Sequence, residues 1–223
     1  MGFTRQTLEF LSENRRQNHK MWFEAHKADY QTEVVAPLAA LTRELAPELH
    51  AIDNELICIP AVGKSISRIY RDTRFSKDKS LYRDVMWCVF MRDKKLYHGL
   101  PGYFFELSPR GFRYGCGYYQ ADTDSMEAIR RLILNRDQSF AAALKSYEKQ
   151  DIFAIEGDLY KKSRYPEEDE RLRNWLDRKN ICLIHNSRDF NLLFSETLAQ
   201  TVAAHYRMIA PIYDFLIKAE SVK

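Results

Sequence analysis

Apolar residues recur every three or four positions near the start of the chain, which is the pattern of helices that bury one face. Thr4 is a suitable N-cap, and Phe3 and Leu8 are placed to pack across the first turn. The pattern predicts a short helix that ends near Ser12. Residues 13–20 are polar and basic and are predicted to form a loop.

A longer helix is predicted to begin near Asn18. Pro37 should kink or split it, because proline removes a backbone donor and clashes with the preceding turn. The helix carries one apolar stripe, which consists of Phe23, Tyr30, Val34, Leu38, Leu41 and Leu45.

The pattern changes to that of strands after Pro60. Residues 66–70 mix polar and apolar side chains and are predicted to form one strand. Residues 85–91 are apolar without interruption, which predicts a central strand covered on both faces.

A hairpin is the clearest local prediction of the sequence. Residues 102–107 and 112–119 flank Ser108-Pro109-Arg110-Gly111, in which proline and glycine suit a tight turn. Gly115 and Gly117 lie in the second strand, where glycine indicates a bulge or the close approach of another group.

The remainder of the chain is predicted to be mostly helical. A first helix follows a cap at Asp122 or Thr123 and buries an apolar face. The further elements are a helix over residues 140–147, a helix from Pro166 to Arg178, a short strand over residues 181–184, and a last helix from Ser195 with a kink at Pro211.

These elements predict an α+β protein with a central antiparallel sheet flanked by N-terminal and C-terminal helices. We expect a single domain over residues 1–223. Its parts are a helical region over residues 1–55, a sheet over residues 60–120 and a second helical region over residues 122–223.

Composition excludes several classes of protein. The 223 residues are 45% apolar and 13% aromatic, enough for a hydrophobic core and unlike collagen, coiled coils or disordered chains. No apolar stretch is long enough to span a membrane, and residues 1–11 lack the apolar region of a signal peptide. A cytoplasmic location and no membrane partner are therefore expected.

The four cysteines form no Cys-x-x-Cys motif, so the sequence favours buried free thiols in a reducing compartment, with a disulfide left open. They are Cys58, Cys88, Cys116 and Cys182.

Positive charge is concentrated in one segment. The whole chain has a formal net charge of only +3, too small to indicate a nucleic-acid binder by itself. Residues 64–83, however, hold seven basic residues against two acidic ones. Any anion-binding site is therefore expected there.

The established phosphate-binding and catalytic motifs are absent from the chain. His19 and His26 are seven residues apart, about 10 Å along a helix, which is too far for two ligands of one zinc ion. His26 and His205 lie on apolar stripes and are interpreted as core histidines. The sequence assigns no metal or cofactor.

The segment between the two predicted strands has the chemistry of an anion site. Arginine and lysine offer donors without acceptors, and the planar guanidinium suits phosphate. Phe75 and Tyr82 would orient the loop or stack on a base or sugar. The predicted ligand is a phosphate-containing molecule or nucleic acid. The predicted anion-binding residues are Arg68, Arg71, Arg74, Lys77, Lys79, Tyr82 and Arg83, with Arg130 joining from the following helix.

A structural interpretation stays open. Asp72 and Asp78 would pair with neighbouring cations, and the aromatic residues of the segment, Phe75 and Tyr82, would fix the loop to the core. In that case the segment would be a salt-bridged loop without a ligand.

The run Arg71-Asp72-Thr73-Arg74-Phe75-Ser76-Lys77-Asp78-Lys79-Ser80-Leu81-Tyr82 resembles the hallmark of a family of bacterial and fungal conserved hypothetical proteins, a domain of unknown function. The resemblance extends over nearly the whole chain, including Trp22-Phe23 and Gly102-Tyr103 through Gly117. Leu81 stands where the family commonly has proline. The resemblance supports the predicted fold and implies no established activity.

A metal-dependent phosphoesterase or nuclease is the enzymatic alternative. Asp93-Lys94-Lys95 fits a short acid-x-Lys pattern in which a carboxylate holds a metal, with Asp72 or Asp84 as a second ligand. The pattern is also typical of an ordinary exposed turn. Asp122-x-Asp124 is better interpreted as a helix cap.

Overall fold

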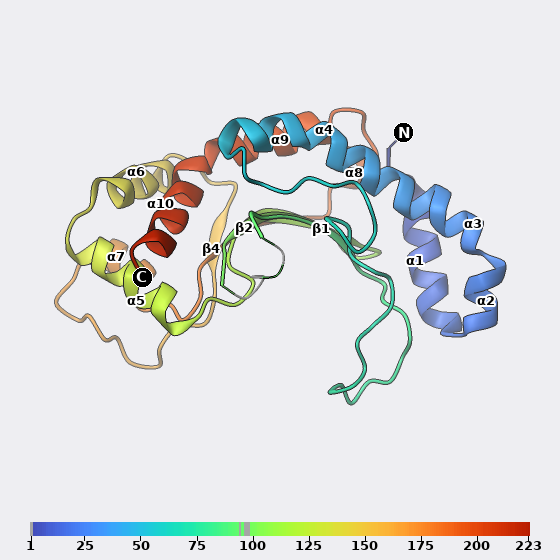
Figure 1. Cartoon of the computed structure of the whole chain (residues 1–223), viewed down its shortest axis with the longest axis horizontal. Helices are drawn as coiled ribbons and strands as arrows, with labels where there is room; N and C mark the ends of the chain where they lie inside the picture. The colour runs from blue at the N-terminus through green and yellow to red at the C-terminus, as the bar shows by residue number, and fades with distance from the viewer. Residues whose placement is uncertain (1, 94, 96–98) are drawn as a thin grey trace. The chain divides into compact units, whose positions relative to one another are not determined.

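The computed structural model describes residues 2–93, 95 and 99–223 of the chain (Figure 1). It has a five-stranded antiparallel sheet in the order β1-β2-β3-β5-β4, with helices before and after it in the sequence. The predicted α+β class is confirmed. The described residues within 1–90, 104–114 and 186–203 form one compact unit, called unit 1. Those within 91–103, 115–185 and 204–223 form unit 2. The expectation of one domain stays a prediction.

The first helix of unit 1 is longer than predicted. Helix α1 (Arg5–Gln17) begins after Thr4, whose backbone N–H donates to Thr7 Oγ1 at 3.1 Å. The predicted end near Ser12 is wrong, because the chain stays helical to Gln17. Glu13 accepts hydrogen bonds from the side chains at positions 16 and 17, which lie one turn further along the helix.

Pro37 divides the second helical region, as predicted. Helices α2 (Lys20–Ala25) and α3 (Lys27–Asp29) lead into the π-helical turn η1 (Tyr30–Val35), and α4 (Ala36–Ile52) has Pro37 in its first turn. A wide π turn before proline accommodates the missing donor and the bulky ring. All six residues of the predicted stripe are buried.

Strand β1 (Met86–Phe90) lies at one end of the strand order and has alternating burial. The prediction of a central strand covered on both faces is therefore wrong. The segment at residues 65–67 borders β1, since Ser67 N–H donates to Trp87 O at 2.8 Å and Val89 N–H donates to Ser65 O at 2.9 Å. Residues 66–70 form isolated bridges rather than the predicted strand.

The predicted hairpin is confirmed. Strands β2 (Gly102–Ser108) and β3 (Gly111–Gly117) flank the turn at Pro109 and Arg110. The close approach predicted at the strand glycines is also confirmed. A Cβ added to Gly115 would lie 1.8 Å from the carbonyl oxygen of Leu183 in β5 (Cys182–Ser187).

Strand β5 confirms the predicted strand at residues 181–184, so the sheet extends beyond the expected limit at residue 120. Strand β4 (Ala154–Glu156) pairs antiparallel with it, and Ile155 lies opposite Leu183. The sequence pattern did not predict β4, which lies inside the C-terminal region expected to be helical. It is short, and short strands leave a weak periodic signal.

Helices of unit 2 pack around an aromatic core. Helix α10 (Ala210–Ser221) packs against α5 (Thr123–Leu134) and α6 (Gln138–Glu148). The Phe140 and Trp175 ring centroids lie 5.6 Å apart, edge to face. The other α-helices in the described part of the chain are α7 (Glu170–Leu176), α8 (Phe190–Leu193) and α9 (Leu198–Met208).

Helix α7 begins at Glu170, so the predicted start at Pro166 is wrong. The carboxylate of Asp169 accepts a hydrogen bond from Leu172 N–H at 3.0 Å and caps the helix there. The predicted break at Pro211 is confirmed, because α10 begins beside it.

All four cysteines are free, and Cys88 and Cys116 are buried. In the part of the chain that the structure describes, no helix is both long enough and apolar enough to cross a membrane.

Candidate functional site

The basic loop, defined as residues 68–83, is a narrow excursion of unit 1 that appears as the long teal hairpin in Figure 1. Its two ends pair with each other. Arg71 N–H donates to Leu81 O at 2.8 Å, and Arg83 N–H donates to Ile69 O at 2.9 Å. These bonds make a short antiparallel stem that leads to an irregular tip.

Tyr82 anchors this stem in the core of unit 1. Its side chain is fully buried, and its ring stacks on Phe23 with 5.0 Å between centroids. Burial raises the pKa of the Tyr82 hydroxyl to about 12. Tyr82 is enclosed by its own unit, so it orients the loop and presents no surface to a ligand.

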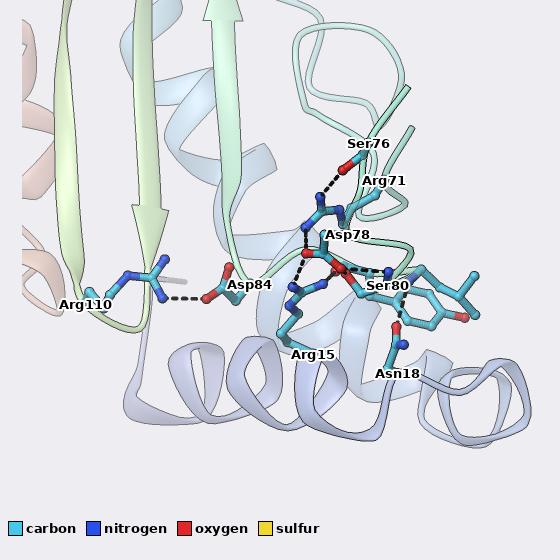
Figure 2. Close-up of polar contacts among 10 residues, drawn as sticks. Arg15, Asn18, Arg71, Ser76, Asp78, Ser80, Asp84 and Arg110 are labelled. Carbon is cyan, nitrogen blue, oxygen red and sulfur yellow. Dashed lines mark hydrogen bonds and ion pairs between the residues drawn. The ribbon is translucent and has the colours of Figure 1, made fainter. Parts of the chain in front are cut away.

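Asp78 is the centre of the polar contacts at the loop (Figure 2). Its Oδ2 accepts from Arg15 Nη2 at 2.7 Å and from Arg71 Nη1 at 2.6 Å. Its Oδ1 accepts from the Ser80 backbone N–H at 2.9 Å and the Ser80 hydroxyl at 2.7 Å. The Ser80 donors and the Arg15 guanidinium hold the pKa of Asp78 well below its usual range. One ionised carboxylate therefore serves two arginines.

Helix α1 holds the loop by two further bonds. Arg15 Nη1 donates to Tyr82 O at 3.0 Å, and Asn18 Oδ1 accepts from Leu81 N–H at 2.6 Å. Sequence reasoning missed both Arg15 and Asn18. One local signal exists for Asn18, because asparagine tolerates the left-handed conformation it adopts after α1, at φ 47°.

The tip of the loop has its own ion pair. Arg74 forms a two-pronged contact with Asp72, with Nε 3.0 Å from Oδ1 and Nη2 2.7 Å from Oδ2. These bonds lower the pKa of Asp72 to about 2. Lys79 Nζ donates to the backbone oxygen of Thr73 at 2.8 Å. Phe75 is 95% exposed and is not fixed to the core as the structural interpretation expected.

A pocket of about 290 Å³ lies beside the stem and is lined by Arg71, Asp72, Arg83, Asp84 and Val85. The guanidinium of Arg83 lies 4.5 Å from the centroid of the Trp87 ring, which orients it by a cation–π contact. Asp84 Oδ2 accepts from Arg110 Nη1 at 2.6 Å. Two guanidiniums and two carboxylates therefore line one pocket.

The structure separates the predicted anion-binding cations into groups. Arg71 and Arg83 line the pocket together. The side chains of Arg68 and Lys77 are exposed and have no ion pair or hydrogen bond to any residue that the structure describes. Arg110 was not among the predicted site residues, yet it forms an ion pair with Asp84 of the pocket. No local pattern in the sequence links these two residues.

Arg130 lies in α5 of unit 2 and is 2% exposed. Its Nε donates to Leu176 O at 3.0 Å and its Nη2 to Arg178 O at 2.7 Å. Its Nη1 contacts Glu127 Oε1 at 2.8 Å. Every one of these partners belongs to unit 2.

The carboxylates considered as metal ligands make separate local contacts. Asp93 Oδ1 accepts from Lys95 N–H at 2.8 Å, as in a turn, while Lys94 lies outside the described residues. Asp122 caps α5, as predicted, by accepting from Ser125 N–H at 2.7 Å. Among the described residues, no three His, Cys, Asp or Glu side chains are grouped to hold a metal ion.

The two histidines interpreted as core residues are half-buried. His26 Nδ1 lies 2.8 Å from Trp22 O, and its ring stacks on Trp22 with 4.1 Å between centroids. Burial and the neighbouring His185 lower the pKa of His205.

A search of curated proteins finds no match to this chain. A family model described as a conserved hypothetical protein, DUF2461, matches residues 6–215. The matched range contains all but the first residue of α1, the basic loop, the five strands and the later helices as far as the first half of α10. That description assigns no activity. Because the match extends over nearly the whole chain, the protein belongs to the DUF2461 family of conserved hypothetical proteins.

Proposed function

We propose that unit 1 binds a phosphate-containing anion in the pocket beside the basic loop. The observation that supports this proposal is that Arg71 and Arg83 line the same pocket. Guanidinium groups match the geometry of phosphate oxygens and donate two parallel hydrogen bonds. The contact of Arg83 with Trp87 orients one of these donors before a ligand arrives.

The charge balance around the pocket favours an anion. Asp72 and Asp84, the two carboxylates of the pocket, are already paired with Arg74 and Arg110. Arg71 shares Asp78 with Arg15, so two positive charges meet one negative charge at that point. These ion pairs hold four arginines against three aspartates: Arg15, Arg71, Arg74 and Arg110 against Asp72, Asp78 and Asp84.

The pocket volume limits what can enter. At about 290 Å³ it lies at the lower end of ligand sites, which run from about 300 to 1,000 Å³. It suits one or two phosphate groups, while the rest of a larger ligand would stay outside.

Calorimetric titration with pyrophosphate and with ATP tests the proposal, at about 50 and about 200 mM salt. Arg83→Ala should weaken binding by roughly tenfold or more, since a charge-assisted hydrogen bond contributes about 1.5–3 kcal/mol. Arg171→Ala is the matched control, because Arg171 is an exposed arginine of unit 2 with a carboxylate partner of its own. Equal affinities of wild type and Arg83→Ala, or no binding at either salt, would leave the loop with a structural role only.

A metal-dependent phosphoesterase is the second candidate, favoured by the presence of Asp72 and Asp84 in the same pocket as two arginines. Carboxylates can hold Mg²⁺ or Mn²⁺ while guanidiniums bind the phosphoryl oxygens. A phosphatase and nuclease screen with each metal separates the candidates. Turnover that Asp84→Asn abolishes would indicate the enzyme, and binding without turnover would indicate the anion site alone.

A further inference from the structure

Phe75 is an unusual feature of the molecular surface. At 95% exposure, it is the most exposed large apolar side chain among the described residues. Burying a phenylalanine side chain stabilises a protein by about 1.5–3 kcal/mol, and unit 1 forgoes this gain here. Among the described residues, its ring has a cation–π contact with the Arg74 guanidinium, 5.8 Å from the ring centroid.

The residues around Phe75 carry positive charge that is not compensated locally. Lys79 donates to a neutral backbone oxygen, and Lys77 contacts no carboxylate in the described part of the chain. Arg74 is paired with Asp72, so these two residues cancel each other. An open aromatic ring with two uncompensated lysines nearby is complementary to a ligand that has both flat rings and negative charges.

Single-stranded nucleic acid has this chemistry. Its unpaired bases stack on exposed aromatic rings, and its phosphates pair with nearby cations. In a duplex the bases are already stacked on one another, so their faces are not accessible to Phe75. An anionic membrane is favoured less, because the residues flanking Phe75 are polar or charged: Thr73, Arg74, Ser76 and Lys77.

Resting on the proposed phosphate pocket, we propose that the tip of the basic loop binds single-stranded nucleic acid, with Phe75 stacked on a base. Lys77 and Lys79 contact the adjoining phosphates, and the pocket at Arg71 and Arg83 takes a further phosphate of the same strand. This assignment makes Phe75 a base-binding residue with no part in holding the pocket phosphate.

Fluorescence anisotropy with a labelled oligothymidylate of about 12 nucleotides tests this inference. Phe75→Ala should weaken binding by about 5- to 150-fold, the range that corresponds to 1–3 kcal/mol for one stacked base. Phe75→Tyr keeps the ring and should retain most of the affinity, whereas Phe75→Leu keeps apolar bulk and should behave like alanine. Tyr119→Ala is the matched control, since Tyr119 is a 68% exposed aromatic residue of unit 2.

Pyrophosphate binding, measured on the same variants, distinguishes this inference from the function on which it rests. Phe75→Ala should leave pyrophosphate affinity unchanged, and Arg83→Ala should weaken the binding of both pyrophosphate and oligothymidylate. If pyrophosphate binds but Phe75→Ala leaves oligothymidylate affinity unchanged, the stacking inference is wrong and the pocket stands. If neither ligand binds, both are wrong. Binding to phosphatidylserine vesicles that depends on Phe75, without oligonucleotide binding, would overturn the inference in favour of a membrane surface.

Discussion

Replacement of Arg130 by methionine tests whether this arginine stabilises unit 2 or binds an anion. Arg130 is almost completely buried, and it donates to the backbone oxygens of Leu176 and Arg178. Methionine fills a similar volume and leaves both oxygens without that donor. Each charge-assisted bond contributes about 1.5–3 kcal/mol, so the two bonds at the low end amount to about 3 kcal/mol. The contact with Glu127 adds little, because that carboxylate is 45% exposed.

A loss of about 3 kcal/mol should lower the melting temperature by roughly 6–12 °C in a chain of this length. Differential scanning calorimetry at pH 7 measures the change, and Arg131→Met provides the control. Arg131 is the exposed neighbour of Arg130 and donates to the Val222 backbone oxygen at 2.9 Å. A melting temperature within about 2 °C of wild type, together with weaker pyrophosphate binding, would refute this reasoning and show that Arg130 is an anion-binding residue, as the sequence predicted.

Three further perturbations have expected outcomes. Gly115→Ala should destabilise unit 2 by about 1–3 kcal/mol, seen as a lower urea midpoint, because its Cβ would collide with Leu183 O; an unchanged midpoint would contradict the close approach. Lowering the pH below about 6.5 should destabilise the protein, because the folded pKa of His205 is depressed and the unfolded state then binds more protons; His205→Asn should reduce this dependence of the melting temperature. Asp78→Asn should speed hydrogen exchange at the loop amides at pH 7. In the wild type, acid should speed this exchange only below the ordinary carboxyl pKa of 3.8, since the folded pKa of Asp78 is lower still. Unchanged exchange rates would show that the ion pairs do not order the loop.

Local patterns predicted those parts of the fold that depend on neighbours along the chain. The helix-breaking effect of Pro37 is a property of its own ring and missing donor, and the structure has a π turn immediately before it. The turn at Ser108–Gly111 needs only residues that suit tight turns. Gly115 and Gly117 indicated a close neighbour, although the pattern could not identify that neighbour as β5.

Other predictions failed where a partner far along the chain or a competing local bond changed the outcome. Residues 85–91 have the continuous apolar pattern of a central strand, yet β1 ends the strand order. The segment at residues 65–67 occupies its outer edge, and an apolar run does not reveal which segment covers it. Residues 13–17 are polar, and only Asn14 of them is buried, so they show no apolar periodicity that would predict a helix. Side-chain hydrogen bonds one turn apart support the helix there.

The sequence by itself determined that positive charge gathers at residues 68–83 and that the chain has an α+β fold. Only the tertiary structure decided how that charge is arranged. It placed Arg15 of α1 and Asn18, which follows α1, against a loop more than sixty residues away, with one carboxylate, Asp78, between two guanidiniums. Ion pairs of this kind depend on which surfaces are in contact after folding, and the spacing of residues along a chain does not indicate which distant segments will be in contact.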